Sequence, residues 1–228
     1  MSQCHKYYHK SPFQWQIDVG GDIIESTSNI QTHNQLLVRK TGEGKSLVYL
    51  VTGTILRGVT LVISPLLSLA MDKARKILKI TCDSNITSSH LDEMNSQNIS
   101  VLQWITRLGN YATIFIFCSP QSLIRNDHFL TFLLDGQFIN FVVVDEVHLF
   151  CKFANTCRRE FSSLQQVLFS KFRQSRLHIP TLFMTATCSS EIIEDIESLV
   201  GFKLNHKHWS SPADMIHRSV ALDTRYTT

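Results

Sequence analysis

Short apolar runs alternate with longer segments of helical pattern along the chain. The runs are rich in β-branched residues and lie at 36–38, 59–63, 113–118, 141–144 and 181–184. The helical candidates are 45–56, 66–78, 98–108, 158–172 and 190–199, the last of which stops at Gly201. Near-continuous apolar strands that alternate with helices indicate a parallel sheet covered on both faces. We therefore predict an α/β fold with a doubly wound, mainly parallel sheet and helices on both faces.

Length and composition indicate one globular domain. The chain has 228 residues, of which 43% are hydrophobic, enough to bury one sizeable core and too few for two. We place the domain at 12–202, between an N-terminal tail at 1–11 and a C-terminal tail at 203–228 that shows no clear period. Residues 82–97 are rich in Ser, Asn and Asp and are predicted to form a surface loop.

Charge and cysteine content narrow the class of protein. The net charge of +3 and the pI near 8.5 fall short of the pI above about 9 that is typical of dedicated nucleic-acid-binding domains. The six cysteines are scattered without a CxxC pair, which favours reduced thiols over a disulfide framework. The sequence has no secretory pattern and no apolar run of about 18 residues, so we expect a soluble intracellular protein without a membrane span.

A phosphate-binding loop is predicted between the first apolar run and the first helix. There the chain reads Arg39-Lys40-Thr41-Gly42-Glu43-Gly44-Lys45-Ser46. Glycines such as Gly42 and Gly44 leave room for backbone N–H groups to surround a phosphate, and the start of the following helix adds a favourable field. Lys45 would then reach the β- and γ-phosphates, and the Ser46 hydroxyl would bind Mg²⁺. Arg39 holds the place of the first glycine in the usual GxxxxGKS pattern.

An acidic pair follows the fourth apolar run. Residues 141–144 lead directly into Asp145-Glu146-Val147-His148, so a buried strand would end at two carboxylates. The carboxyl ends of parallel strands face the crevice in which such sheets bind ligands. Asp145 would hold Mg²⁺ through water, and Glu146 would orient and deprotonate the attacking water. Together with the phosphate loop, the pair predicts a nucleotide-hydrolysing site.

With both motifs present, the chain resembles superfamily-two helicases, and neighbouring segments resemble their RecQ group. Residues 41–49, TGEGKSLVY, are similar to that family's TGGGKSLCY, and helicase-type loops often lack the first glycine. Residues 61–69, LVISPLLSL, with Asp72 beyond, resemble its VVSPLISLxxDQ. Lys73 stands where the family has glutamine.

The longest resemblance begins at the acidic pair. Residues 145–161, DEVHLFCKFANTCRREF, align without a gap with the RecQ pattern DEAHCISQWGHDFRPEY. In that family this aromatic-rich loop senses single-stranded DNA and signals to the ATP site. Phe153 replaces its tryptophan, while Arg158 and Glu160 are retained. The resemblance covers about 12–202 and implies one RecA-like P-loop domain, the first of the two motor lobes.

The resemblance assigns roles to individual residues. ATP would be bound by Gln16, which reads adenine and for which Gln14 is the other option, and by the loop residues Thr41, Gly42, Glu43, Gly44, Lys45 and Ser46. Lys45 and Glu146 would be catalytic, and Ser46 and Asp145 would hold Mg²⁺. Hydrolysis would be coupled to lobe movement by His148, Thr185, Ala186 and Thr187. The candidates for nucleic-acid binding are Ser64, Pro65, Ser119, Pro120, Phe153 and Arg158.

The function implied is an ATP- and Mg²⁺-dependent motor lobe of a 3′-to-5′ DNA helicase that acts on single-stranded or partly duplex DNA. Only about forty residues follow Thr187, so we expect a second RecA-like lobe, with its arginine finger, to come from elsewhere in cis or in trans. The chain alone should then hydrolyse ATP feebly and not unwind DNA. DNA work implies a nuclear location in a eukaryote.

Two alternatives stay open. The first is a non-catalytic regulatory module that binds nucleotide and nucleic acid without turnover, which the altered aromatic loop favours. The second is an RNA-directed DExH ATPase, against which the gap-free alignment of 145–161 argues. A GTPase is not expected, because the guanine-reading NKxD motif is absent from the sequence.

Overall fold

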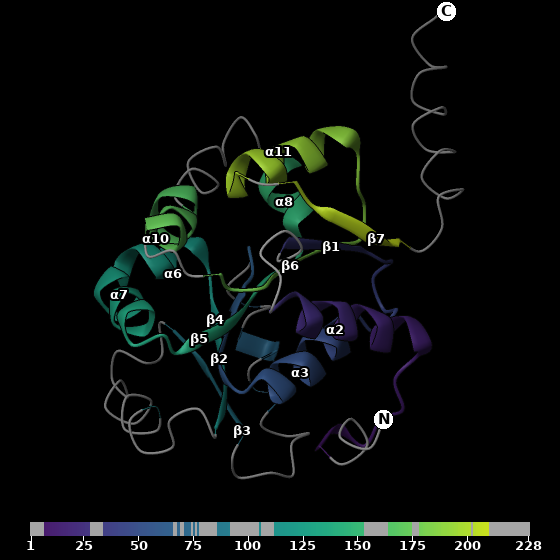
Figure 1. Cartoon of the computed structure of the whole chain (residues 1–228), viewed down its shortest axis with the longest axis horizontal. Helices are drawn as coiled ribbons and strands as arrows, with labels where there is room; N and C mark the ends of the chain where they lie inside the picture. The colour runs from purple at the N-terminus through teal and green to yellow at the C-terminus, as the bar shows by residue number, and fades with distance from the viewer. Residues whose placement is uncertain are drawn as a thin grey trace, which may run out of the picture.

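All of the paired strands run parallel in one sheet. The computed structural model describes residues 7–27, 34–65, 68, 71–73, 75, 77, 86–91, 105, 112–152, 164–174, 178–201 and 203–209. Its strands are β1 (Asn34–Val38), β2 (Gly58–Ile63), β3 (Ile86–His90), β4 (Thr113–Cys118), β5 (Ile139–Val144), β6 (Thr181–Thr185) and β7 (Asn205–Trp209). They are ordered β3-β4-β2-β5-β6-β1-β7 (Figure 1).

Helices cover both faces of this sheet (Figure 1). One face carries α2 (Gln14–Ser26) and α3 (Lys45–Leu56). The other carries α6 (Pro120–Arg125), α7 (Asp127–Asp135), α8 (Val147–Lys152), the π-helical segment η4 (Gln165–Phe169), α10 (Ser170–Gln174) and α11 (Ser190–Val200).

Alternating strand side chains build two separate hydrophobic cores. In β2, Leu61 and Ile63 join the core beneath α7, α8 and α11, while Val62 joins the core beneath α2 and α3. In β4, Ile116 and Phe117 divide in the same way. Successive side chains of a strand point to opposite faces, so strands buried on both sides are apolar at almost every position. This arrangement confirms the predicted doubly wound α/β fold.

The predicted elements are confirmed where the structure describes them. All five apolar runs are strands, and 45–56 is helical over its whole length. The helix predicted at 190–199 is α11, which the Ser189 side chain caps at its start and which ends at Gly201 in the left-handed conformation. The helix predicted at 158–172 is described only from residue 164, and most of 66–78 and 98–108 lies outside the described residues.

Among the described residues, two strands and four helices were not predicted. The surface loop predicted at 82–97 is wrong for residues 86–90, which form β3 at one edge of the sheet. At the other edge, β7 lies within the predicted C-terminal tail and pairs with β1. Within the predicted N-terminal tail, Tyr8 is buried and its hydroxyl lies 2.6 Å from Thr54 Oγ1 of α3. The missed helices are α2, α6, α7 and α8.

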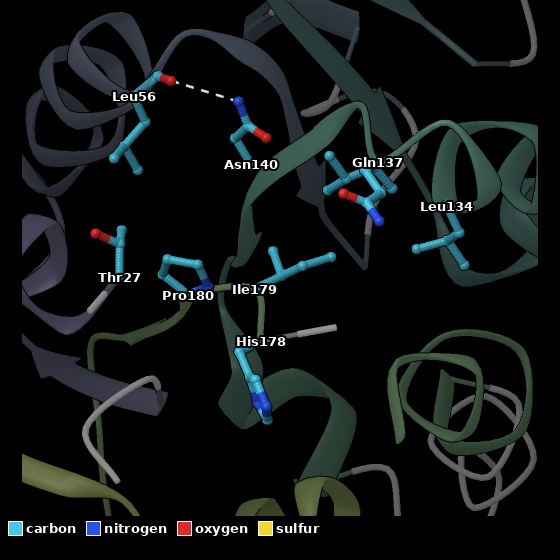
Figure 2. Close-up of a pocket in the computed structure, with 9 residues that line it drawn as sticks. Thr27, Leu56, Leu134, Gln137, Asn140, His178, Ile179 and Pro180 are labelled. Carbon is cyan, nitrogen blue, oxygen red and sulfur yellow. Dashed lines mark hydrogen bonds between the residues drawn. The ribbon is translucent and has the colours of Figure 1, made fainter. Parts of the chain in front are cut away.

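A pocket of about 340 Å³ opens at the edge of the sheet where β5 and β6 begin (Figure 2). Its lining includes Leu56 at the end of α3 and Asn140 in β5, whose side-chain amide donates to the Leu56 carbonyl at 3.4 Å. None of the candidate site residues lines this pocket. In the described part of the chain, no helix has the length and apolar character needed to span a membrane.

Candidate active site

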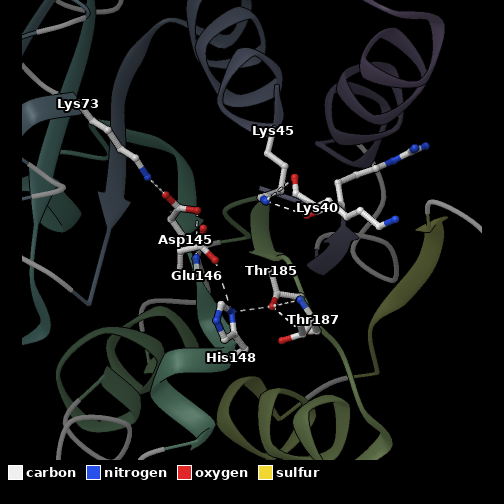
Figure 3. Close-up of polar contacts among 9 residues, drawn as sticks. Lys40, Lys45, Lys73, Asp145, Glu146, His148, Thr185 and Thr187 are labelled. Atoms are coloured by element: carbon white, nitrogen blue, oxygen red, sulfur yellow. Dashed lines mark hydrogen bonds and ion pairs between the residues drawn. The ribbon is translucent and has the colours of Figure 1, made fainter. Parts of the chain in front are cut away.

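Parallel pairing brings the predicted motifs together at the carboxyl ends of the strands, which form one edge of the sheet. In the strand register, Val38 lies beside Thr185, and Ile63 lies beside both Cys118 and Val144. The segments that follow these residues therefore leave the sheet at the same edge. They carry the phosphate loop, the acidic pair and the Thr185–Thr187 segment, as Figure 3 shows.

The phosphate loop turns on two glycines before α3 begins. Gly42 and Gly44 have φ angles of 90° and 86°, in the left-handed region that side chains other than glycine rarely adopt. The Lys45 side chain folds back into the loop, where its Nζ donates to the carbonyls of Arg39 at 2.7 Å and Lys40 at 3.2 Å. The loop thus holds a buried lysine ammonium at the start of a helix, where a phosphate would also be favoured.

Gln16 reaches the phosphate loop from α2. Its side-chain Nε2 donates to the Gly44 carbonyl at 2.9 Å, and its Oε1 accepts the Phe13 N–H at 2.8 Å. Gln16 is buried, whereas Gln14 is exposed and donates to Asp18 on its own helix. Of the two glutamines that the sequence left open, only Gln16 contacts the loop in the described structure.

Arg39 also takes part in the contact between α2 and the loop. Its guanidinium lies 4.5 Å from the centroid of the Trp15 ring, a cation–π geometry. The Arg39 N–H donates to the Thr185 carbonyl at 3.0 Å and ties the loop to β6. The side chain that stands in place of the usual glycine therefore extends over an aromatic ring.

The acidic pair lies at the end of β5 with a lysine beside it. Asp145 is buried, and its Oδ2 forms an ion pair with the Lys73 ammonium. Its Oδ1 accepts the Glu146 N–H at 3.0 Å. Glu146 itself has φ of 50°, a left-handed conformation unusual for a residue other than glycine. Sequence reasoning placed Lys73 at a position of the family motif but gave no signal of this contact.

Burial and neighbouring charge shift the pKa values of two groups. Burial raises the pKa of the Glu146 carboxyl, and the negative charge of Asp145 raises it further, while Lys45 and Lys73 oppose the change. Burial lowers the pKa of Lys45, and the charges of Glu146, Asp145 and Glu43 partly offset that effect. A carboxyl group with a raised pKa is a better proton acceptor, which suits a general base.

A hydrogen-bond chain joins the acidic motif to β6. His148 Nδ1 lies 2.9 Å from Thr185 Oγ1 and 3.4 Å from Glu146 Oε2. The Thr185 hydroxyl donates its single hydrogen to the Thr187 carbonyl at 2.6 Å, so the hydrogen between Thr185 and His148 must come from Nδ1. Of the predicted coupling residues, Thr185 thus contacts both His148 and Thr187 (Figure 3), and Ala186 lies between the two threonines in the sequence.

The nucleic-acid candidates fall into two groups. Ser64 and Ser119 follow β2 and β4 and are buried, and Ser119 caps α6 by accepting the Ser122 N–H at 3.1 Å. Pro120 is buried and Pro65 is partly exposed. Phe153 and Arg158 lie outside the described residues. The structure therefore brings Ser64, Pro65, Ser119 and Pro120 to the carboxyl ends of the strands, where the phosphate loop also lies, and shows no surface for nucleic acid among the described residues.

The oxygen groups at this edge suit Mg²⁺. The Ser46 hydroxyl and the Asp145 carboxylate are hard oxygen ligands, and Glu146 Oε2 is buried with no hydrogen bond among the described residues beyond its 3.4 Å contact with His148 Nδ1. No group of three or more His, Cys, Asp or Glu side chains able to hold a metal occurs in the described part of the chain. Mg²⁺ that is bound together with a nucleotide needs only one or two carboxylates, because phosphates and water supply the other ligands.

Comparisons with known proteins agree with this geometry. The family model for DEAD/DEAH box helicases matches residues 21–196. The chain is 29% identical over 190 residues to the probable ATP-dependent DNA helicase RecS of Bacillus subtilis (strain 168), and covers 35% of it with 83% of its own length. It is 25% identical over 206 residues to the ATP-dependent DNA helicase RecQ of Pasteurella multocida (strain Pm70), covering 29% of it with 90% of its own length.

A solved structure shows the same fold. The DUF1998 helicase MrfA superposes with a TM-score of 0.58 at 17% sequence identity, over 86% of this chain and 30% of that one. The fold and the glycine-containing loop define a RecA-like P-loop domain, and the chain belongs to the DEAD/DEAH box helicase family. Within that family it is RecQ-like and corresponds to the N-terminal motor lobe. Membership of the family implies the use of ATP. The chain spans about a third of the length of the relatives described above.

Proposed function

We propose that the chain is the ATP-binding and ATP-hydrolysing motor lobe of a RecQ-like 3′-to-5′ DNA helicase. One observation carries the proposal: Lys45, Asp145, Glu146 and the Thr185–Thr187 segment meet at one edge of the sheet although they lie far apart in the sequence. Such an arrangement is what phosphoryl transfer requires, because catalysis there depends on positioning and on electrostatic stabilisation.

In the proposed reaction, each described side chain has a separate task. The Lys45 ammonium leaves the carbonyls of its own loop and contacts the β- and γ-phosphates. Ser46 and Asp145 would hold Mg²⁺, and the ion would supply positive charge to neutralise the phosphates. The Glu146 carboxylate accepts a proton from water as the water oxygen bonds to the γ-phosphorus and the bond to the bridging oxygen breaks. Gln16, together with Thr41, Gly42, Glu43 and Gly44, completes the nucleotide pocket.

The contact of His148 with both Glu146 and Thr185 supports a coupling role. A change at the γ-phosphate that moves Glu146 would alter the His148 contact and, through Thr185 and Thr187, the segment that follows β6. That segment leads into α11.

The proposed nucleic-acid partner is single-stranded or partly duplex DNA. The RecS and RecQ relatives are DNA helicases by name, which favours DNA over RNA. Ser64, Pro65, Ser119, Pro120, Phe153 and Arg158 are the proposed contacts. In a eukaryote such a protein would act in the nucleus.

Strand separation is proposed to require a second RecA-like lobe, in cis or in trans. That lobe supplies the arginine finger, which contributes about 10³ to 10⁵ in rate in related phosphoryl-transfer enzymes. The chain alone is therefore expected to hydrolyse ATP slowly and to leave duplex DNA intact in an unwinding assay. Unwinding by the purified chain would refute this part of the proposal.

Steady-state ATPase with and without single-stranded DNA tests the proposed function. We expect slow turnover that single-stranded DNA raises and that single-stranded RNA of the same length and sequence raises less. Glu146→Gln should remove turnover and keep nucleotide binding. Stimulation by RNA alone would instead indicate an RNA-directed ATPase.

A second candidate function is nucleotide binding without hydrolysis. Two described contacts favour it, since Lys73 pairs with the proposed metal-binding carboxylate and Lys45 is bound to carbonyls of its own loop. ATP affinity in the micromolar range with no turnover, in the presence or absence of DNA, would distinguish this candidate from the first.

A further inference from the structure

Two carboxylates and two lysines meet at the end of β5 (Figure 3). Asp145 and Glu146 interact electrostatically with both Lys45 and Lys73, and the formal charges of these four side chains sum to zero. Lys45 comes from the phosphate loop, whereas Lys73 comes from a helical segment beyond β2 and approaches Asp145 from a different side (Figure 3). Within this group of four, the two ammonium groups therefore balance the two carboxylates.

Both oxygens of Asp145 are already engaged. Oδ2 is paired with the Lys73 ammonium, and Oδ1 accepts the Glu146 N–H at 3.0 Å. The Asp145 side chain is 3% exposed, so a carboxylate left without a cation there would be costly. The Lys73 side chain is 24% exposed, which gives its ammonium a path into water when it leaves.

We propose that Lys73 is an internal cation that competes with a divalent metal ion for Asp145 and so sets the metal affinity of the site. The proposal rests on the proposed function in one respect, the assignment of Asp145 as a metal-binding residue. Lys73 holds the carboxylate in the metal-free protein, and a divalent ion and its water ligands bind once the ammonium has left Oδ2. Lys73 thereby lets the site persist without metal and weakens its binding of metal.

Direct binding of Mn²⁺, a spectroscopic substitute for Mg²⁺, tests this competition. The free ion is quantified by electron paramagnetic resonance in titrations of the full chain without nucleotide. Lys73→Gln, which keeps a polar side chain and removes the charge, should bind Mn²⁺ about tenfold more tightly, the equivalent of about 1.4 kcal/mol. Lys73→Arg keeps the charge and should stay within about twofold of the unmodified chain.

The chain offers a matched control in a second lysine–aspartate pair. Lys171 pairs with Asp127 at 2.6 Å, and its side chain is also 24% exposed, but it joins α10 to α7 away from the acidic motif. Lys171→Gln should leave Mn²⁺ affinity unchanged. Equal effects of Lys171→Gln and Lys73→Gln would show a general effect of lost positive charge and would overturn the proposal.

Asp145→Asn separates failure of this inference from failure of the proposed function. If Asp145→Asn loses Mn²⁺ binding while Lys73→Gln binds like the unmodified chain, Asp145 is a metal ligand and the competition is refuted. If Asp145→Asn binds Mn²⁺ normally, Asp145 is not the metal ligand. That result would refute both the competition by Lys73 and the assignment of Asp145 as a metal-binding residue.

Thermal unfolding supplies a second measurement of Mn²⁺ binding, for use where the affinity is too weak for the titration. In EDTA, Lys73→Gln should unfold at a lower temperature than the unmodified chain, because Asp145 loses its counter-ion. Mn²⁺ should raise the unfolding temperature of Lys73→Gln more than that of the unmodified chain. Equal shifts in the two proteins would contradict the proposal.

Discussion

Alanine at Gly44 should destabilise the fold more than alanine at Gly42, although both glycines lie in the same loop. Both have positive φ angles near 90°, so either alanine meets backbone strain. A Cβ at Gly42 would meet nothing within 4 Å, whereas a Cβ at Gly44 would lie 2.8 Å from Gln16 Nε2. Only the Gly44 substitution therefore displaces the side chain that joins α2 to the phosphate loop.

The cost of backbone strain and the cost of displacing the Gln16 amide can be estimated separately. Left-handed backbone costs about 1–2 kcal/mol for a residue with a Cβ, and both variants share this term. In Gly44→Ala the Gln16 amide must also move and give up its 2.9 Å bond to the Gly44 carbonyl. That loss adds about 1 kcal/mol. We expect a total loss of about 1–2 kcal/mol for Gly42→Ala and about 2–3 kcal/mol for Gly44→Ala.

Urea unfolding followed by circular dichroism measures both values, and a double-mutant cycle tests their cause. In a Gln16→Ala background, the difference between the two glycine variants should disappear, because the displaced amide is absent. A Gln14→Ala background is the control, since that exposed glutamine bonds only to Asp18 in the described structure. A difference that persists with Gln16→Ala would refute the steric argument.

Three further predictions concern one buried side chain, Tyr8, and two half-buried ones, Glu146 and Cys188. Tyr8→Phe should lower the free energy of unfolding by about 1 kcal/mol, because the Tyr8 hydroxyl bonds to Thr54 and to the Leu50 carbonyl; an unchanged urea midpoint would exclude residue 8 from the folded domain. Glu146→Gln should stabilise the metal-free chain at pH 8 and lose this advantage near pH 4, because a raised pKa makes the folded wild type less stable as pH rises through that pKa. Urea titrations at both pH values measure the difference in free energy of unfolding between Glu146→Gln and the wild type. A variant that is less stable than the wild type at pH 8 would contradict the prediction. Burial raises the pKa of Cys188 to about 11, so its peptide should be alkylated by iodoacetamide at pH 8 far more slowly than in the urea-unfolded chain, as followed by mass spectrometry.

The central strands could be predicted because burial on both faces leaves a plain sequence signal. Residues 113–118 and 141–144 are almost wholly apolar, and both are strands. The edge strands β3 and β7, with sequences ITSSH and NHKHW, carry mostly polar residues. An edge strand needs no continuous apolar run, so composition alone predicted a loop and a tail for these segments.

Helix α2 was missed for a different reason. It contains Gly20 and Gly21, which lower helix propensity. A Cβ at Gly20 would lie 3.0 Å from Thr52 Oγ1 of α3, so a residue that weakens the local helical pattern is the one that allows α2 and α3 to pack closely. Residues 14–26 are therefore helical because of tertiary packing between α2 and α3, which a local sequence pattern does not encode.

The candidate site was predictable where its residues lie next to one another in the sequence. The phosphate loop and the acidic pair each carry their own pattern of residues. The ion pair of Lys73 with Asp145 joins residues that lie 72 positions apart, and only the parallel order of β2 and β5 brings them together. The same holds for the choice of Gln16 over Gln14, which depends on the side of α2 that faces the loop.

The proposed ATP site is tested most directly by calorimetric titration of ATP with Mg²⁺ into the chain and two lysine variants of the same loop. Lys45 is buried and Lys40 is exposed, so only the first is expected to contact phosphate. We expect Lys45→Ala to weaken ATP binding by about ten- to a hundredfold, as the loss of a charge-assisted hydrogen bond implies, and Lys40→Ala to bind nearly as tightly as the unmodified chain. Equal affinities for Lys45→Ala and the unmodified chain would contradict the claim that this edge of the sheet is an ATP site.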